Sequence, residues 1–235
     1  MTKYKVLSTG KLERSLIEQA RENNIEIDVV PFIETEAVDA LEIYTEIENA
    51  LMQIATVVFT SANAVEAVAA HLHDYKPGWR IYCIGNTTKK LVGKYFGMDL
   101  IAATARDANE LAEKIIEDDL TEEVIFFCGD KRRDELPALL NQHDIEVNEI
   151  EVYRTKLLQN KIDKGYHGIL FFSPSAVISF FKNNSINEET VLFAIGKTTA
   201  AEIKKYSVNR VVVSDETEKK FLIGKAIKFF DKNQN

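Results

Sequence analysis

The sequence predicts an α/β fold built on largely parallel sheets. Short apolar segments of strand length alternate along the chain with segments in which apolar residues recur at intervals of three and four. Some strand-like segments are apolar at consecutive positions, as in Phe126-Phe127-Cys128, which is typical of strands covered on both faces. The hydrophobic fraction of 46% and the charged fraction of 28% are ordinary for a packed globular protein. The alternation of strand and helix therefore indicates parallel sheets with helices on their faces.

Ten segments have the length and apolar content expected of strands. In chain order they span residues 4–8, 26–31, 56–60, 80–84, 100–103, 123–128, 146–154, 168–172, 190–195 and 209–213.

Between these strands, apolar residues three or four positions apart predict helices. The helix expected over residues 39–53 has an acidic side, which we interpret as solvent-exposed. Trp79 follows the turn Lys76-Pro77-Gly78 and is interpreted as a packing residue. The clearest helical sets are Leu12, Leu16 and Ala20; Tyr44, Ile47, Leu51 and Ile54; Val65, Val68 and Leu72; Leu111 and Ile115; and Leu136 and Leu140.

Three segments of the first half of the chain recur in the second half in the same order. Their offsets are 120, 112 and 111 residues. Because the order is kept and the spacing is nearly constant, we predict an internal duplication that gives two similar α/β units. The pairs are 25–35 with 145–155, 57–65 with 169–177, and 84–88 with 195–199.

The repeat leaves two domain arrangements open. Residues 33–35 and 151–155 follow strand-like runs without a helix start signal, so we predict extended connectors there. The symmetry of the sequence does not choose between a tandem arrangement and a crossover at both connectors. The domains are about 1–120 and 121–235 in the first case, and 1–32 plus 156–235 and 36–150 in the second.

The repeated motifs place small polar residues where a strand is expected to end and a helix to begin. Such residues are common helix caps, which is the plain structural interpretation. Helix N-termini also offer free N–H groups and the positive end of the helix dipole, so they bind anions. In parallel sheets these turns gather at the carboxyl edge, where ligands bind. We therefore predict a site for a ligand with several anionic groups. The candidate residues are Ser61, Asn63, Gly85, Thr87, Thr88, Gly129, Arg133, Ser173, Ser175, Gly196, Thr198 and Thr199.

Several other kinds of site lack a residue that they require. Residues 196–198 are similar to the end of a phosphate-binding loop, but the glycine required five positions earlier is Val191. No GxGxxG or GxSxG motif occurs. His71 and His73 lie two positions apart on a segment expected to be helical, so they should face different sides. We expect no metal and no cofactor.

Charge and cysteine content limit the setting in which the protein works. With 29 Lys and Arg against 37 Asp and Glu, the net charge of −8 argues against nucleic acid as a partner. Cys83 and Cys128 lie in apolar runs outside any CxxC pair, so we expect buried, reduced thiols. No signal peptide and no membrane-spanning segment is expected. We predict a cytoplasmic protein.

Tyr153 breaks the symmetry of the repeat. It lies in the second connector, and its repeat partner in the first is Ile33. An aromatic hydroxyl in place of an aliphatic side chain makes Tyr153 a candidate for chemistry. The alternative is an interface tyrosine whose hydroxyl is satisfied by a hydrogen bond.

In combination, these motifs resemble the uroporphyrinogen-III synthase family. The resemblance covers essentially the whole chain in the right order, and its specificity lies in the combination because each motif is short. It implies two flavodoxin-like domains joined by a two-stranded connector, with a cleft between them, and therefore the crossover arrangement. The segments that carry it are 57–65, 84–88, 128–133, 152–155, 171–177 and 194–199.

The activity implied by this resemblance is closure of hydroxymethylbilane, a linear tetrapyrrole with eight carboxylates, to uroporphyrinogen III. Water leaves the terminal hydroxymethyl group, and ring D is inverted through a spiro intermediate. The resemblance implies that Tyr153 assists departure of the hydroxyl, and a phenol of ordinary pKa near 10 would be protonated at neutral pH. It also implies a monomer. Positions that match the family's cleft residues are Thr88, Ser173, Thr198 and Thr199, together with Arg133 as the basic residue after a glycine.

One loop departs from the family pattern. Many bacterial members have Thr-Arg-Pro after the first strand, whereas this chain has Ser8-Thr9-Gly10-Lys11. Carboxylate contacts are therefore not carried over to this loop. A second interpretation of the whole sequence is a non-catalytic module whose two lobes bind a small polyanionic ligand. The formation of the type III isomer distinguishes the two, because the activated bilane closes unaided to the non-inverted type I isomer.

Overall fold

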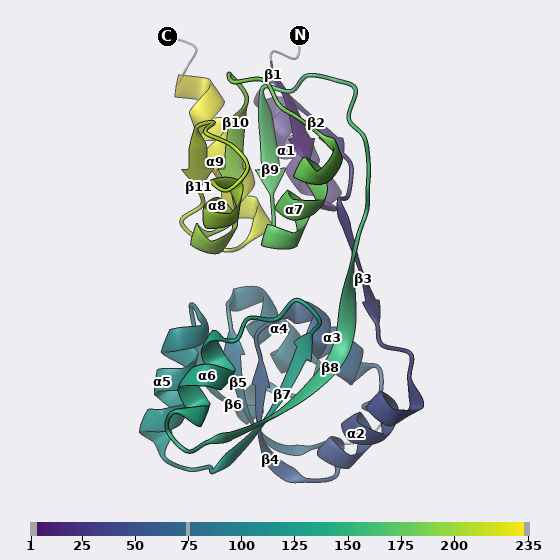
Figure 1. Cartoon of the computed structure of the whole chain (residues 1–235), viewed down its shortest axis with the longest axis vertical. Coiled ribbons are helices and arrows are strands. Elements are labelled where there is room, and N and C mark those ends of the chain that lie inside the picture. Colours follow the sequence, from purple (N-terminus) through teal and green to yellow (C-terminus); the bar gives the residue numbers. More distant parts are fainter. Residues whose placement is uncertain (1–3, 74–75, 233–235) are drawn as a thin grey trace. The chain divides into compact units, whose positions relative to one another are not determined.

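The computed structural model describes residues 4–73 and 76–232. The chain divides into two compact units, which Figure 1 shows as separate groups of strands and helices. One unit comprises Thr35–Thr155, and the other combines the chain up to Glu34 with the chain from Lys156 onward. The predicted α/β class with mostly parallel sheets is confirmed.

The unit that combines both ends of the chain is built on a five-stranded parallel sheet in the order β11-β10-β9-β1-β2. Helices α1 and α9 pack on one face, and α7 and α8 pack on the other. The elements are β1 (Tyr4–Ser8), α1 (Arg14–Glu22), β2 (Ile25–Val29), β9 (Gly168–Phe171), α7 (Pro174–Asn183), β10 (Val191–Ala194), α8 (Lys197–Ile203), β11 (Val211–Val213) and α9 (Lys219–Lys232).

The central unit is built on a six-stranded sheet in the order β3-β8-β7-β4-β5-β6. Helices α2, α3 and α4 cover one face, and α5 and α6 cover the other. The elements are β3 (Ile33–Ala37), α2 (Leu41–Leu51), β4 (Ile54–Phe59), α3 (Ala62–Ala69), β5 (Gly78–Ile84), α4 (Asn86–Tyr95), η1 (Met98–Leu100), β6 (Ile101–Ala105), α5 (Ala108–Asp118), β7 (Glu123–Gly129), α6 (Glu135–Asn141) and β8 (Glu146–Leu157).

Two strands, β3 and β8, join the units (Figure 1). The backbone N–H of Val38 donates to the carbonyl of Val152 (3.0 Å), and that of Leu158 donates to the carbonyl of Phe32 (2.9 Å). From one bond to the other, the position beside β3 falls from 38 to 32 while the position on the β8 side rises from 152 to 158, so the two strands run in opposite directions. The segment expected to be an extended connector at residues 33–35 is thus part of a regular strand, because its backbone pairs with β8.

The two sheets share one strand order. If β4 to β8 are numbered 1 to 5 along the chain, they lie in the sheet in the order 3-2-1-4-5, and β3 is an additional edge strand. The other sheet has the same order when β9, β10, β11, β1 and β2 are numbered 1 to 5. The repeated segments 57–65 and 169–177 fall on the first strand of each set and the helix that follows it. The order reverses between β4 and β7 in one sheet and between β9 and β1 in the other. Such reversals are the points at which ligands bind in open α/β sheets.

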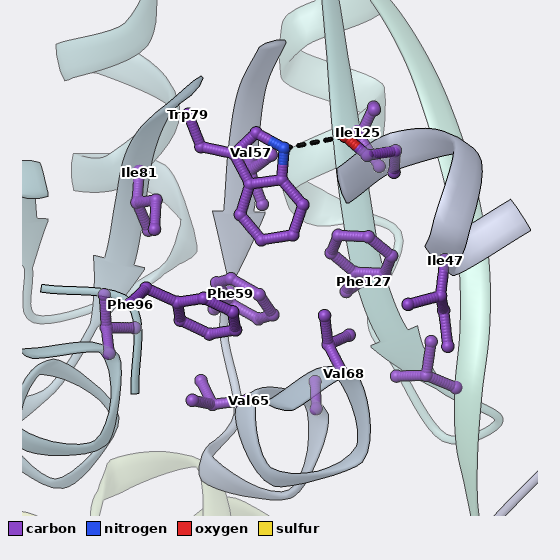
Figure 2. Packing of buried hydrophobic residues seen from close by; sticks show 14 of the residues in the cluster. Ile47, Val57, Phe59, Val65, Val68, Trp79, Ile81, Phe96, Ile125 and Phe127 are labelled. Carbon is purple, nitrogen blue, oxygen red and sulfur yellow. Dashed lines mark hydrogen bonds between the residues drawn. The ribbon is translucent and has the colours of Figure 1, made fainter. Parts of the chain in front are cut away.

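Aromatic packing fills the core of the central unit on the α2–α3–α4 side (Figure 2). The ring of Phe59 stacks on Phe127 at 5.4 Å, and Trp79 contacts Phe96 at 5.3 Å. Trp79 is 3% exposed, and its indole N–H donates to the carbonyl of Ala50 (2.9 Å). Its predicted role as a packing residue is confirmed.

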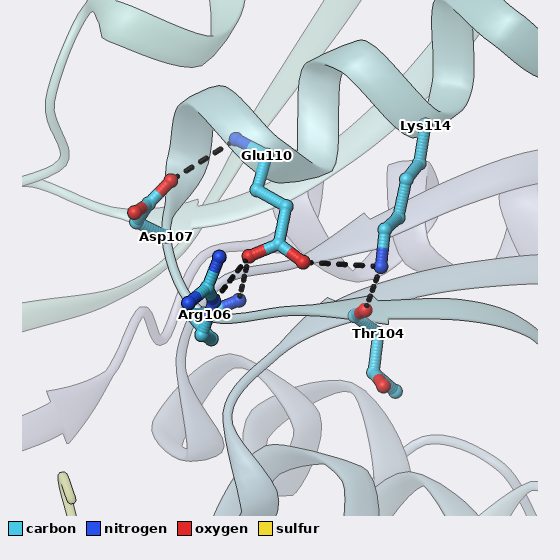
Figure 3. A network of polar contacts seen from close by, with 5 residues as sticks. All are labelled: Thr104, Arg106, Asp107, Glu110 and Lys114. Carbon is cyan, nitrogen blue, oxygen red and sulfur yellow. Dashed lines mark hydrogen bonds and ion pairs between the residues drawn. The ribbon is translucent and has the colours of Figure 1, made fainter.

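A polar network fixes the start of α5 directly after β6 (Figure 3). Asp107 is the N-cap residue, and its carboxylate accepts the backbone N–H of Glu110 (3.0 Å). The Glu110 carboxylate accepts the side-chain and backbone N–H groups of Arg106 (2.9 and 3.1 Å) and pairs with Lys114 (3.2 Å). Lys114 also donates to the carbonyl of Thr104 on β6 (2.8 Å). This network ties the first turns of the helix to the strand.

Three helical assignments made from spacing are wrong at their ends. Leu12 lies outside α1, which begins at Arg14 after the N-cap residue Glu13. Ile54 is the first residue of β4 and 94% exposed, because turns at residues 52 and 53 close α2 before it. Helix α3 ends at Ala69, so Leu72 is outside it. His71 and His73 also follow α3, and His73 has a φ of 45°, so the two histidines are not on a helix.

Candidate active site

The carboxyl ends of β4 and β7 lie side by side where the strand order of the central sheet reverses. The two strands pair in parallel as far as Phe59 and Phe127. After β4 the chain turns into α3 with Ser61 as the N-cap residue, and its hydroxyl accepts the backbone N–H of Asn63 (3.2 Å). β7 ends at Gly129. The predicted site residues Ser61, Asn63 and Gly129 therefore meet at one edge.

A β-bulge brings Tyr153 to the same place. In the β7–β8 pair, Cys128 is opposite Glu151 but Gly129 is opposite Tyr153, so β8 carries one extra residue, Val152. A bulge of this kind redirects the side chain that follows it. Val152 is buried in the core beneath α2 and α3, and the ring of Tyr153, although next in sequence, packs against the same core. In a regular strand, consecutive side chains point to opposite faces.

The absence of a side chain at Gly129 makes room for the phenol ring. A Cβ atom at this position would lie 2.3 Å from Cζ of Tyr153, 2.6 Å from Cε2 and 2.8 Å from Cε1. Real Cβ contacts are not this short, so any other residue would displace the ring. Gly129 thus has a steric role that its position in a turn did not reveal.

The Tyr153 hydroxyl lies in a half-buried, polar environment. Burial raises the pKa of Tyr153, and the nearby Cys128 and Asp130 raise it further. Hydrogen bonds with the side chains of Ser61 and Asn63 act in the opposite direction and lower that pKa. Because the net shift is upward, the phenol keeps its proton at neutral pH and can donate a hydrogen bond.

The basic residues after β7 differ in their partners. Arg133, which the motif indicated, is half-exposed and pairs with Glu135 (3.1 Å). Arg132 pairs with Asp134 and Glu149, and its backbone N–H donates to the carbonyl of Gly129 (3.0 Å). Arg133 thus lies in the loop after β7, and the neighbouring arginine whose backbone bonds to the end of the strand is Arg132. Arg132 also lines a hollow of about 370 Å³ with Cys128, Gly129, Asp130, Glu149 and Glu151.

The turn from β5 into α4 carries three further candidates of the central unit. Gly85 has a φ of 80°, a conformation that favours glycine, and its N–H donates to the carbonyl of Ala105 (3.0 Å). Thr87 is exposed in the first turn of the helix, whereas Thr88 is only 5% exposed. Of the two hydroxyls, that of Thr87 is the one open to a ligand.

The corresponding turns of the other unit follow β9 and β10. Ser173 is the N-cap residue of α7, where its hydroxyl accepts the N–H of Ala176 (3.1 Å), and Ser175 is half-buried. Gly196 precedes α8 in extended backbone, so its conformation does not require glycine. Thr198 is exposed and Thr199 is 2% exposed. These five residues lie at the carboxyl edge of their own sheet.

Next to these turns, the hydroxyl groups of the loop after β1 already donate to backbone carbonyls. Ser8 and Thr9 are fully buried, and the hydroxyl of Thr9 donates to the carbonyl of Leu170 (2.7 Å). The ammonium of Lys219, however, donates to the carbonyl of Lys11 (2.9 Å) and lies 5.8 Å from the ring centre of Phe172. Sequence reasoning missed Lys219, because the 208 residues that separate it from Lys11 gave no signal of their proximity.

Both thiols are buried in strands, as expected. Cys83 is 0% and Cys128 is 3% exposed. Burial raises the pKa of each to about 11, so both are protonated at neutral pH. Among residues 4–73 and 76–232, no group of three or more His, Cys, Asp or Glu is placed to hold a metal ion. Within the same residues, no helix is long and apolar enough to cross a membrane.

Comparisons with known proteins agree on one family. The family model described as uroporphyrinogen-III synthase HemD matches residues 14–224. A mutant uroporphyrinogen III synthase from Thermus thermophilus is similar in structure, with a TM-score of 0.70 and 14% identity over 99% of this chain and 100% of that one. The uroporphyrinogen-III synthetase of Helicobacter pylori gives a TM-score of 0.68 and 14% identity, over 97% of this chain and 100% of that one. At these identities the two structures support the fold alone.

Proposed function

The chain belongs to the uroporphyrinogen-III synthase family, whose members close hydroxymethylbilane to uroporphyrinogen III, and we propose that it does so with Tyr153 assisting the loss of water. The reaction is a cyclising lyase reaction of porphyrin and haem biosynthesis. The observation that carries the role of Tyr153 is its position at the strand-order reversal, beside Ser61 and Asn63 and against Gly129.

The chemistry needs a donor at the departing hydroxyl. When the carbon–oxygen bond of the hydroxymethyl group breaks, the oxygen leaves with the bonding electrons and must gain a proton to become water. Because burial raises its pKa, the phenol is protonated at neutral pH, and it gives this proton to the departing oxygen, so that water and a phenolate form. The proton that the pyrrole carbon loses on ring closure restores the phenol. The side chains of Ser61 and Asn63 can return a hydrogen bond to the phenol oxygen as its O–H polarises.

The remaining task is to hold eight carboxylates. We assign it to the turns after β4, β5 and β7 in one sheet and after β9 and β10 in the other, where helix N-termini offer backbone N–H groups. Exposed Thr87 and Thr198 add hydroxyl donors, and Lys219 and Arg133 add charge. Because this binding is local, a net charge of −8 does not oppose it. Thr88 and Thr199 are buried in the first turns of α4 and α8, so their part in this proposal is through the backbone N–H groups of those turns.

Several properties of the whole chain belong to the same proposal. The shared strand order and the matching motifs support an internal duplication, with the unit of 1–32 plus 156–235 and the unit of 36–150 as its two domains. We also propose a cytoplasmic monomer whose partner is hydroxymethylbilane, without nucleic acid. The family match supports this synthase interpretation and not the alternative of a non-catalytic module for a small polyanion.

Product analysis tests the reaction directly. Purified protein is given freshly prepared hydroxymethylbilane, and the uroporphyrin isomers are separated after oxidation. We expect the type III isomer, in excess over the type I isomer of the unassisted reaction. Formation of type I alone would refute the synthase function.

A Tyr153→Phe variant tests the role of the phenol. It keeps the ring against Gly129 and removes only the hydroxyl that donates the proton, so kcat should fall by about 100-fold or more. The matched control is Tyr44→Phe, which removes an exposed hydroxyl that donates to Asp39 (2.6 Å) in the same unit. A folded Tyr153→Phe protein with the activity of the control would remove Tyr153 from the mechanism.

A further inference from the structure

The connection between β7 and the Tyr153 segment depends on one residue that has no assigned role, Asp130. Its backbone N–H donates to the carbonyl of Tyr153 (3.2 Å). Its carboxylate oxygen Oδ1 accepts the backbone N–H of Thr155 (2.8 Å). Asp130 therefore holds β8 on both sides of Arg154.

These bonds act where the regular strand pairing fails. The bulge at Val152 disrupts the ladder between β7 and β8, and β7 ends at Gly129, one residue before Asp130. Beyond that point β8 has no regular partner on this side. The main-chain bond of Asp130 closes the Gly129–Tyr153 pair that follows the bulge, and its carboxylate then takes the place of the next acceptor of the ladder, so the backbone that carries the phenol is held despite the bulge.

The other unit has no equivalent arrangement. An offset of 120 places Gly10 opposite Asp130 and Ile33 opposite Tyr153. Gly10 has no side chain that could accept an N–H group, and Ile33 has no hydroxyl to orient. The carboxylate is thus present only in the copy that carries the phenol, which argues for a role tied to Tyr153 and not a general need of the fold.

We propose that Asp130 is a positioning residue for Tyr153, whose main-chain N–H and carboxylate together fix residues 153–155 and so keep the phenol beside Ser61 and Asn63. This inference rests on the proposed function of Tyr153. Asp130 does not touch the reacting atoms in this scheme, and its second oxygen pairs with Lys131 (3.1 Å).

The test compares three variants with the wild-type enzyme. Asp130→Ala removes the acceptor for Thr155, and Asp130→Asn keeps an acceptor oxygen in the same place. Asp107→Ala is the matched control, since it also removes a carboxylate that accepts a backbone N–H group in the central unit (3.0 Å, from Glu110). Each protein is assayed for kcat and KM in forming the type III isomer.

A second measurement reports on the phenol independently of turnover. Protein labelled with ¹³C at the tyrosine Cζ position is examined by NMR at neutral pH, with the Tyr153 signal assigned through Tyr153→Phe. The Cζ shift responds to hydrogen bonding at the hydroxyl. We expect Asp130→Ala to shift or broaden this signal, and Asp130→Asn and Asp107→Ala to leave it unchanged.

The kinetic expectation follows from misplacing a catalytic group. Asp130→Ala should lower kcat by about 10- to 100-fold, with KM changed by less than about threefold, and Asp130→Asn should restore most of the activity. An unchanged Tyr153 signal in Asp130→Ala, or an equal loss of kcat in Asp107→Ala, would overturn the positioning role. If wild-type protein forms no type III isomer, the proposed function fails, while the NMR comparison still decides whether Asp130 holds Tyr153.

Discussion

Replacement of Gly129 by alanine is the sharpest perturbation that the structure offers. A Cβ atom there would lie 2.3 Å from Cζ of Tyr153, whereas ordinary contact begins at 3.4 Å. The ring must therefore retreat by at least about 1 Å, since carbon atoms do not approach more closely than their van der Waals contact allows. That movement carries the hydroxyl away from Ser61 and Asn63.

The size of the effect follows from this displacement. A misplacement of about 1 Å in a catalytic group can cost about 100-fold in rate, so we expect kcat of Gly129→Ala to fall by about two orders of magnitude. The extra methyl group also overpacks the strand end, at a cost of about 1–3 kcal/mol in the free energy of unfolding. Steady-state formation of the type III isomer gives kcat, and urea denaturation gives the stability.

A second glycine provides the matched control. A Cβ atom on Gly168, the first residue of β9, would lie 2.8 Å from the ring of Phe193 and 3.1 Å from that of Phe230. Gly168→Ala therefore produces a similar clash with aromatic rings at the amino end of a strand, away from the turns. It should lose comparable stability, and the folded enzyme should keep its kcat. Wild-type kcat in Gly129→Ala, or an equal loss of kcat in both variants, would refute the reasoning.

Three further predictions concern stability and reactivity. Trp79→Phe keeps an aromatic ring but removes the indole donor to the buried carbonyl of Ala50 (2.9 Å), which then keeps the backbone N–H of Gln53 (3.1 Å), so the free energy of unfolding from urea denaturation should fall by about 0.5–1.5 kcal/mol; an unchanged midpoint would contradict this. Hydrogen bonds lower the pKa of Glu110 from 4.5 to about 2, so its carboxylate stabilises the fold above pH 4.5 and this stabilisation is lost as the pH falls toward 2. The difference in melting temperature between wild type and Glu110→Gln should accordingly be largest at neutral pH and should disappear as the pH falls toward 2. A difference that stays constant with pH would argue against the network. With pKa values of about 11, Cys83 and Cys128 should react with a thiol reagent at pH 8 only after denaturant is added, and rapid reaction of the native protein would show that they are accessible.

The sequence located most of the fold because the relevant patterns are local. Ten strands were predicted by short apolar runs, and each overlaps a strand of the structure. The helices failed at their ends, where Leu12 extended the apolar spacing ahead of the first turn of α1 and Ile54 and Leu72 continued it past the last turn of α2 and α3. Spacing reports which face of a segment is buried, but the hydrogen bonds that end a helix do not depend on it.

The candidate site was predictable to a smaller extent. Ser61 and Ser173 were identified as caps from the residue type alone, and both cap a helix. Arg133 was predicted from its place in the motif, and the structure adds its neighbour Arg132, whose backbone N–H donates to the carbonyl of Gly129. A sequence pattern does not distinguish two adjacent arginines in a loop, and only the geometry of the turn shows that their partners differ.

The sequence by itself determined the α/β class, the repeated strand-to-helix turns, the two buried thiols and the asymmetry at Tyr153. Each of these depends on residue type and on spacing within one segment. The tertiary structure alone decided that Gly129 makes room for the phenol, that Asp130 holds its backbone, and that Lys219 meets Lys11. These contacts join residues far apart in the chain, and the first two depend on a one-residue shift in the β7–β8 register. A shift of one residue reverses the side to which a strand residue points, and only the pairing of the two strands determines where that shift occurs.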